Sequence, residues 1–285
     1  MIRFILITVI ACLLAFNIKA KAIDYAQSEI KDNKNTYLSN LSKEQKFLYT
    51  NLVFAGGVTT YGFINWEYGK RGYNFGNENW FGGGTKEGGA DKFGHLYTAY
   101  STSRLVKTLY QKWGFSNNEA AKRAAITSFI FTTTIELGDG FSDFGTSYED
   151  FINNSFGQAI AYYLDTHPKM SEKIDLRFEY NPRDGLSSDP TTDYNSLKYL
   201  VAIKMAGFEP LNKGFSRYLE FHLGYYARGY TRTQRYQKEE RNVYIGVGIN
   251  IAQILHDLSF KKTSRIFNYY QAPYSYVSTE HDFNN

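Results

Sequence analysis

The spacing of apolar residues divides the chain into two halves, with the change near residue 170. In the first half, apolar positions recur every three or four residues, which is the spacing of a helix face. In the second half, from Ile174 onward, apolar and polar residues alternate one by one, as in half-buried strands. The chain therefore predicts an α+β fold: a helical bundle of about four helices followed by an antiparallel β-meander of about four strands.

The helical half contains one long uncharged segment and three segments with N-terminal signals. Residues 47–66 carry no charged side chain, but their glycines, threonines and asparagines favour a buried or membrane-surface helix over a membrane span. The three later helices are expected to end near Trp113, Leu137 and Asp165. Their expected caps are Asp91 and two capping boxes, Ser116 with Glu119 and Ser147 with Asp150.

Composition narrows the class of protein. The 285 residues are 43% hydrophobic, and 25 tyrosines and 22 phenylalanines exclude an intrinsically disordered chain. A mean hydropathy of −0.43 argues against a helical membrane protein with several spans. The formal charge of +4 is too small to indicate a nucleic-acid partner.

The N-terminus has the organisation of an export signal. A short basic start precedes an apolar run at 4–16, and Ala20-Lys21-Ala22 is a small-x-small exit, so we expect cleavage after Ala22. In an alternative interpretation residues 9–12 form a lipobox and Cys12 is lipidated, although the apolar run continues past that point. Either way the chain is exported to the periplasm or outer membrane. After cleavage at Ala22 it keeps no cysteine for a disulfide.

These signals predict five segments along the chain. They are a signal peptide at 1–22, a polar leader at 23–42, a helical domain at 43–169, an antiparallel β region at 170–260 and a C-terminal tail at 261–285.

Three of the predicted helices carry polar residues on otherwise small or apolar stripes. His95 heads the stripe of the first, Glu136 ends that of the second, and Asp150 and Asn154 begin that of the third. The connector between the first two helices is short, so they are expected to be antiparallel. All four side chains then converge at the same end of the bundle.

Other polar residues fall near the same place. Asp91 and Lys92 lie one turn from His95, Asp139 follows Glu136 by three residues, and Ser142 lies in the next loop. A histidine, a lysine and several carboxylates around one cavity mouth are typical of a site with perturbed pKa values. Each also has a structural interpretation, because aspartates stabilise helix N-termini and a core histidine can be hydrogen-bonded.

Three motifs in this region resemble those of a known family. They are Asp91-Lys92-Phe93-Gly94-His95, then Glu136-Leu137-Gly138-Asp139-Gly140-Phe141-Ser142, then Ser147 with Asp150, Asn154 and Gly157. Over about 90–165 the chain resembles the YfiM-like family of predicted periplasmic lipoproteins, which implies an envelope location and no established reaction. The motif order is also similar to that of VanZ-like membrane proteins. Those proteins carry an arginine where this chain has Gly145-Thr146.

Two functions fit these observations. The first is an exported, non-enzymatic envelope protein whose polar cluster is structural or binds a ligand, with a membrane surface or an envelope lipid or glycan as its partner. The alternative is an envelope hydrolase or a lipid- or glycan-modifying enzyme. It would use His95 as general acid or base, Glu136 to orient it, and Asp139 or Asp150 as a second carboxylate.

The remaining candidate residues have binding roles. They are Asp91, Lys92, Ser142, Asn154 and Gly157, the last being small enough for two helices to approach closely. No cofactor is expected. A weaker alternative places a divalent metal at His95, Glu136, Asp139 and Asp150, and this donor set suits manganese or magnesium better than zinc.

Overall fold

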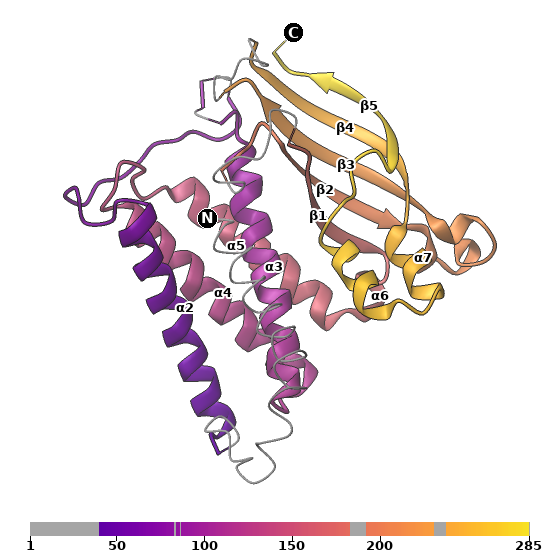
Figure 1. The fold of residues 1–285 in the computed structure, drawn as a ribbon, viewed down its shortest axis with the longest axis horizontal. Coiled ribbons are helices and arrows are strands. Elements are labelled where there is room, and N and C mark those ends of the chain that lie inside the picture. The colour runs from indigo at the N-terminus through magenta and orange to yellow at the C-terminus, as the bar shows by residue number, and fades with distance from the viewer. Residues whose placement is uncertain (1–39, 83, 86, 183–191, 231–237, 285) are drawn as a thin grey trace, which may run out of the picture.

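The computed structural model describes residues 40–284 except 83, 86, 183–191 and 231–237. The expected signal peptide at 1–22, Cys12 and most of the polar leader lie outside these described residues. Within them the chain forms a helical bundle followed by an antiparallel sheet, so the predicted α+β class is confirmed (Figure 1). Across the described residues, no helix is both long and apolar enough for a membrane crossing.

Four long helices form the bundle. They are α2 (Lys43–Asn65), α3 (Ala90–Lys112), α4 (Asn117–Asp139) and α5 (Tyr148–Thr166). Helix α2 stands at the outer edge and packs on α4, while α3, α4 and α5 pack on one another (Figure 1). Fully buried alanines between the helices, such as Ala99, Ala124 and Ala161, allow this close packing.

The helix caps follow the sequence signals in two of three cases. Ser116 and Glu119 form the predicted capping box of α4. Ser147 accepts a hydrogen bond from the Asp150 backbone, but the Asp150 side chain turns to other partners, so this box is half formed. Asp91 is not the cap of α3: this prediction was wrong. The cap is Gly89, whose φ of 83° is a left-handed conformation that favours glycine, and Asp91 lies in the first turn.

The sheet has one strand more than expected. Its strands β1 (Ile174–Tyr180), β2 (Leu197–Lys204), β3 (Leu219–Arg228), β4 (Glu240–Ile249) and β5 (Tyr276–Asp282) are hydrogen-bonded in sequence order, and all neighbours are antiparallel. Strand β5 lies where the sequence predicts a C-terminal tail. Because it is a largely exposed edge strand, it needs no apolar alternation, and its mostly polar residues gave no strand signal.

Short helices connect and cover the strands. They are α6 (Pro168–Ser171), η2 (Met205–Gly207), η3 (Glu209–Leu211), η4 (Ser216–Tyr218), α7 (Ile251–Asp257), α8 (Lys261–Ser264) and η5 (Arg265–Asn268). After η5 the chain returns to the first strand, where Tyr270 bridges Phe178.

The sheet buries its polar face. Arg177 is fully enclosed and binds both carboxylate oxygens of Glu220 at 2.7 and 3.0 Å, and His222 contacts the same carboxylate at 2.8 Å. On the opposite face of β3, Phe221 and Leu223 are about half exposed. Farther along that face, Tyr225 and its neighbours Tyr199 and Phe178 pack against the bundle, so both faces of the sheet are partly buried. The polar face can be buried because its charges are paired.

Aromatic side chains join the bundle to the sheet. Phe93 of α3 packs on Tyr225 with ring centroids 5.1 Å apart, and Tyr97 packs on Phe178 at 5.3 Å. Tyr199 belongs to the same buried cluster. This contact anchors the N-terminal half of α3, which is the part of the helix that carries the predicted polar site.

Candidate functional site

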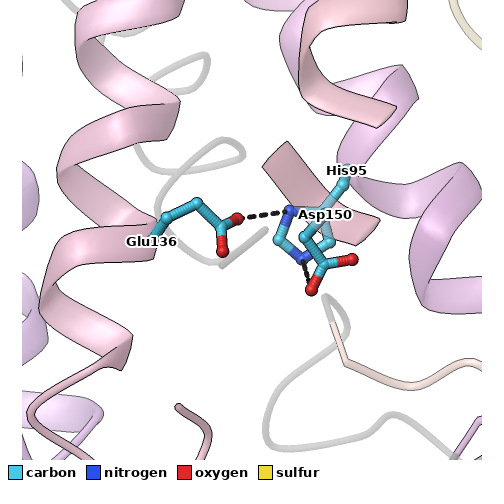
Figure 2. Close-up of side chains that lie close together, drawn as sticks. All are labelled: His95, Glu136 and Asp150. Carbon is cyan, nitrogen blue, oxygen red and sulfur yellow. Dashed lines mark ion pairs between the residues drawn. The ribbon is translucent and has the colours of Figure 1, made fainter. Parts of the chain in front are cut away.

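Three helices bring His95, Glu136 and Asp150 together (Figure 2). The imidazole of His95, near the start of α3, has its Nδ1 3.3 Å from Glu136 Oε1 at the end of α4. Its Nε2 lies 3.6 Å from Asp150 Oδ2 at the start of α5. The convergence expected from the antiparallel order of the helices is therefore present. All three side chains are largely shielded from solvent, and His95, the most exposed, is 12% exposed.

Lys92 lies at the centre of a second group of carboxylates. Its Nζ is 2.8 Å from both Asp91 Oδ2 and Asp150 Oδ1, and 2.5 Å from Glu78 Oε2. The Lys92 side chain is only 1% exposed. Since Asp150 contacts Lys92 through one oxygen and His95 through the other, it joins the two groups. We call the resulting set of six residues the charged cluster: Glu78, Asp91, Lys92, His95, Glu136 and Asp150.

An amide and a hydroxyl orient Glu136 within the charged cluster. The Asn154 side chain donates a hydrogen bond of 3.1 Å to Glu136 Oε1, and the Thr146 hydroxyl donates one of 2.9 Å to the Glu136 backbone carbonyl. Asn154 lies one turn beyond Asp150 on α5, so the same helix supplies a partner to His95 and a partner to Glu136. The Glu136 carboxylate is therefore held by residues of α3 and α5, and the Glu136 backbone by the loop that carries Thr146.

The surroundings of His95 favour its charged form. Burial alone would lower its pKa, but the carboxylates of Asp150 and Glu136 outweigh burial and raise the pKa from 6.5 to about 10. The geometry agrees, because each ring nitrogen faces a carboxylate oxygen and an ionised carboxylate can only accept a hydrogen bond. At neutral pH His95 is therefore an imidazolium cation. In this state it can donate a proton or hold an anion but cannot act as a general base.

Two carboxyl groups at the edge of the charged cluster, those of Asp139 and Glu78, have raised pKa values. Burial and the neighbouring charge of Glu136 raise the pKa of Asp139 to about 7. Burial and the charge of Asp150 raise the pKa of Glu78 to about 8, against the opposing effect of Lys92. The Asp150 carboxyl behaves differently, because His95 and Lys92 outweigh its burial and lower its pKa. The region thus combines fixed ion pairs with two groups that titrate near neutral pH.

Two of the predicted binding residues support the backbone. The Ser142 hydroxyl donates to the Asp139 carbonyl and accepts from the Phe144 backbone N–H, which shapes the loop after α4. Gly157 faces the backbone of α3, where an added Cβ would be 2.1 Å from the Leu96 carbonyl oxygen. Both positions are thus explained by the local fold, and neither side chain contributes charge to the cluster.

Sequence reasoning missed Glu78 and Tyr68. Glu78 lies in the glycine-rich loop that precedes α3, where no periodicity marks a residue as inward-facing. Tyr68 follows α2, and its hydroxyl donates a hydrogen bond to the Ile135 carbonyl beside the Asp139 and Glu136 carboxyls. An isolated acidic residue in a loop of glycines and asparagines was the one signal available for Glu78.

The donor atoms around His95 could also meet at a metal ion. One nitrogen or oxygen from each of His95, Glu136 and Asp150 lies within 4.8 Å of the others, and so do oxygens of Glu78, Asp91 and Asp150. In the second set the Lys92 ammonium already contacts all three oxygens. In the first set Glu136 faces Nδ1 of the His95 ring and Asp150 faces Nε2. In these rotamers a single ion bound to one ring nitrogen would therefore not also be bound by both carboxylates. The carboxylates of both sets are therefore better matched to the cationic side chains of Lys92 and His95 than to a bound metal ion.

The described residues also form a cavity of about 470 Å³ at the other end of α3. Arg104 and Lys107 line it and pair with Asp165 at 3.2 and 3.5 Å. His95 precedes Lys107 by twelve residues, which is about 18 Å along a helix. This cavity is thus separate from the charged cluster.

Comparisons with known proteins identify the helical segment. No curated protein and no solved structure matches the chain. A protein-family model does match residues 77–166, and its description is "Predicted periplasmic lipoprotein (DUF2279)". This description agrees with the expected export to the periplasm, while the similarity to VanZ-like proteins stays a prediction. The segment 77–166, which holds α3, α4, α5 and every residue of the charged cluster, is therefore similar to the DUF2279 family of predicted periplasmic lipoproteins, in agreement with the YfiM-like motifs.

Proposed function

We propose that this protein is a non-catalytic component of the cell envelope and that its charged cluster is a permanent ion-pair network. The network would hold the ends of α3, α4 and α5 and the glycine-rich loop in fixed positions. The observation that supports this role is the pairing of both buried cations: Lys92 contacts three carboxylates and His95 contacts two. Each cation therefore already has more than one anionic partner without any ligand.

The energetics of buried charge favour the same role. A buried charge without a partner is strongly unfavourable, whereas complementary charges with good geometry compensate one another. In this cluster the paired groups come from different helices and from a loop. If any one of these elements moved away, a charge would be left buried without its partner. The cluster thus makes the arrangement of the helix ends specific even where its net contribution to stability is small.

The pH dependence of stability tests the ionic state of His95. Its pKa is raised from 6.5 to about 10 in the folded chain, so its stabilising contribution is complete below the lower value and is lost as the pH rises through the upper one. Asp139 and Glu78 act in the same direction, since their raised pKa values of about 7 and about 8 mean that ionisation opposes folding. The free energy of unfolding, measured with urea, should fall as the pH rises from about 6 to about 10.

A histidine substitution isolates the contribution of His95. In the variant His95→Gln, the free energy of unfolding should depend much less on pH between about 6 and about 10 than in the wild type. His167→Gln, at the exposed end of α5, is the matched control and should keep the wild-type profile. A wild-type profile in His95→Gln would contradict the proposed network.

One observation supports the alternative, an enzyme that modifies an envelope lipid or glycan. Asp139, with a pKa of about 7 and partial exposure, is a carboxylic acid suited to donate a proton near neutral pH. The variant Asp139→Asn removes this acid and keeps the shape of the side chain. Because no salt bridge to Asp139 is present among the described residues, we expect the folded stability to stay close to that of the wild type.

Envelope composition then separates the two functions. Under the proposed structural role, cells with Asp139→Asn keep the wild-type lipid and glycan profile by mass spectrometry. A profile matching that of cells without the protein, from a variant that is folded and present at the normal level, would establish the enzymatic alternative.

A further inference from the structure

Three helices of the bundle expose large apolar side chains to solvent. We call this set the apolar belt: Leu48, Tyr49, Leu52, Val53, Phe63 and Ile64 of α2, Ile126, Phe129 and Leu137 of α4, and Tyr148, Phe151, Phe156, Tyr162 and Tyr163 of α5. The most exposed members are Val53 at 70% and Ile64 at 75%. Phe129 and Phe151 pack against each other with ring centroids 5.7 Å apart, so the belt continues from α4 to α5.

Charged residues are confined to the ends of these helices. The stretches 47–65 of α2, 124–135 of α4 and 151–164 of α5 contain no aspartate, glutamate, lysine, arginine or histidine. The uncharged stretch on α2 runs from residue 47 to residue 65, which corresponds to about 28 Å along a helix. An exposed surface of this length without a charge is not expected for a helix bundle that faces only water.

The end of the bundle where α2 and α4 begin is basic. Its basic side chains include Lys43, Lys46, Lys112, Lys122 and Arg123, and its acidic side chains include Glu44, Glu119 and Asp165, the last paired with Arg104 and Lys107. At the opposite end Glu67 pairs with Lys70 and Arg71 pairs with Asp143, and carboxylates outnumber cations in the charged cluster, so this end has no excess of positive charge. The belt is thus bordered by an excess of positive charge on one side only.

We propose that the apolar belt binds the acyl-chain region of a phospholipid membrane surface, with the basic end against lipid phosphates. Protein partners usually meet a surface whose rim is polar and supplies hydrogen bonds, whereas this belt is uncharged across the outer sides of three helices. Its aromatic residues are ordered as at a lipid interface. On α5, tyrosines occupy the first and last turns and phenylalanines lie between them. The inference is independent of the role of the charged cluster.

Flotation with lipid vesicles tests this surface. The mature wild-type protein should float with vesicles of phosphatidylethanolamine and phosphatidylglycerol. The double variant Val53→Asp with Ile64→Asp should bind at least about tenfold more weakly, because two side chains lose their burial in lipid. Both residues face outward, so the melting temperature should stay close to that of the wild type and reports on the fold separately.

A matched control distinguishes the belt from general hydrophobicity or from an N-terminal lipid. Phe215→Asp removes an apolar side chain of similar exposure, 74%, from the sheet half and should leave vesicle binding unchanged. In a second arm, Lys46→Gln and Lys122→Gln should each weaken binding about fivefold on anionic vesicles and much less on phosphatidylcholine alone.

Two results would overturn the proposal. One is equal vesicle binding by the wild type and the double aspartate variant. The other is a wild-type protein that does not float and is a dimer by light scattering, with the double variant a monomer, since the belt would then bind a second copy of the chain.

Discussion

Lys92→Met is expected to lower the free energy of unfolding by about 3–5 kcal/mol, the largest effect of any single substitution considered for this protein. Methionine matches the length and apolar stem of lysine but removes the ammonium group. The carboxylates of Asp91 and Asp150, with the raised-pKa carboxyl of Glu78 beside them, would then lie in a largely buried site without the cation that each contacts within 2.8 Å. Urea denaturation at neutral pH measures the loss.

Acid should reduce the cost of this substitution. Protonation removes the charge from the same carboxylates, so the difference between wild type and Lys92→Met should shrink as the pH falls below about 5. Lys70→Met is the matched control, because its ion pair with Glu67 is largely exposed and its loss should change stability by less than about 0.5 kcal/mol. A Lys92→Met protein as stable as the wild type would mean that the carboxylates need no cation.

Gly157→Ala is expected to destabilise the protein by about 3 kcal/mol, at the upper end of overpacking effects. The added Cβ would lie 2.1 Å from the Leu96 carbonyl oxygen and 3.0 Å from the Ala99 Cβ. The closest of these atoms belongs to the backbone of α3, which cannot rotate away as a side chain can. The two helices would have to separate, and the contact between His95 and Asp150 would lengthen with them.

A second helical glycine provides the control. Gly56 lies on the exposed side of α2, where an added Cβ would have no neighbour within 4 Å. Gly56→Ala should therefore stabilise the chain by up to about 1 kcal/mol through helix propensity. Thermal and urea unfolding of the two variants together would show whether the loss at Gly157 comes from packing. Equal effects at both sites would contradict the close contact between α3 and α5.

The elements of the fold were largely accessible from local sequence. The capping box of Ser116 and Glu119 acts over three residues and the strand alternation over two, so both signals are complete within a short segment. Asp91 shows the limit of such signals. Its residue type suits a cap, but the preceding Gly89 can adopt the left-handed conformation at the start of α3 and takes that position.

The sequence predicted most members of the candidate site, but it did not predict Glu78 or which residues pair with which. Antiparallel helix order placed His95, Glu136 and Asp150 at one end, and the structure brings them together. The role of Lys92 as a central cation depends on Glu78, which reaches it from a loop without periodicity. The ionic state of His95 likewise depends on which carboxylate each ring nitrogen faces, and helix spacing alone does not specify this.

The sequence by itself determined which residues share a helix stripe or a strand face, because these relations follow from the periods of 3.6 and 2. Only the tertiary structure decided which of those faces is covered. In the sheet, the polar face with Arg177 and Glu220 is buried while Phe221 is half exposed, and on α2 the apolar face with Val53 is turned outward. The physical reason is that burial is set by neighbouring elements: a polar face can be buried where its charges are paired, and apolar groups can stay at the surface.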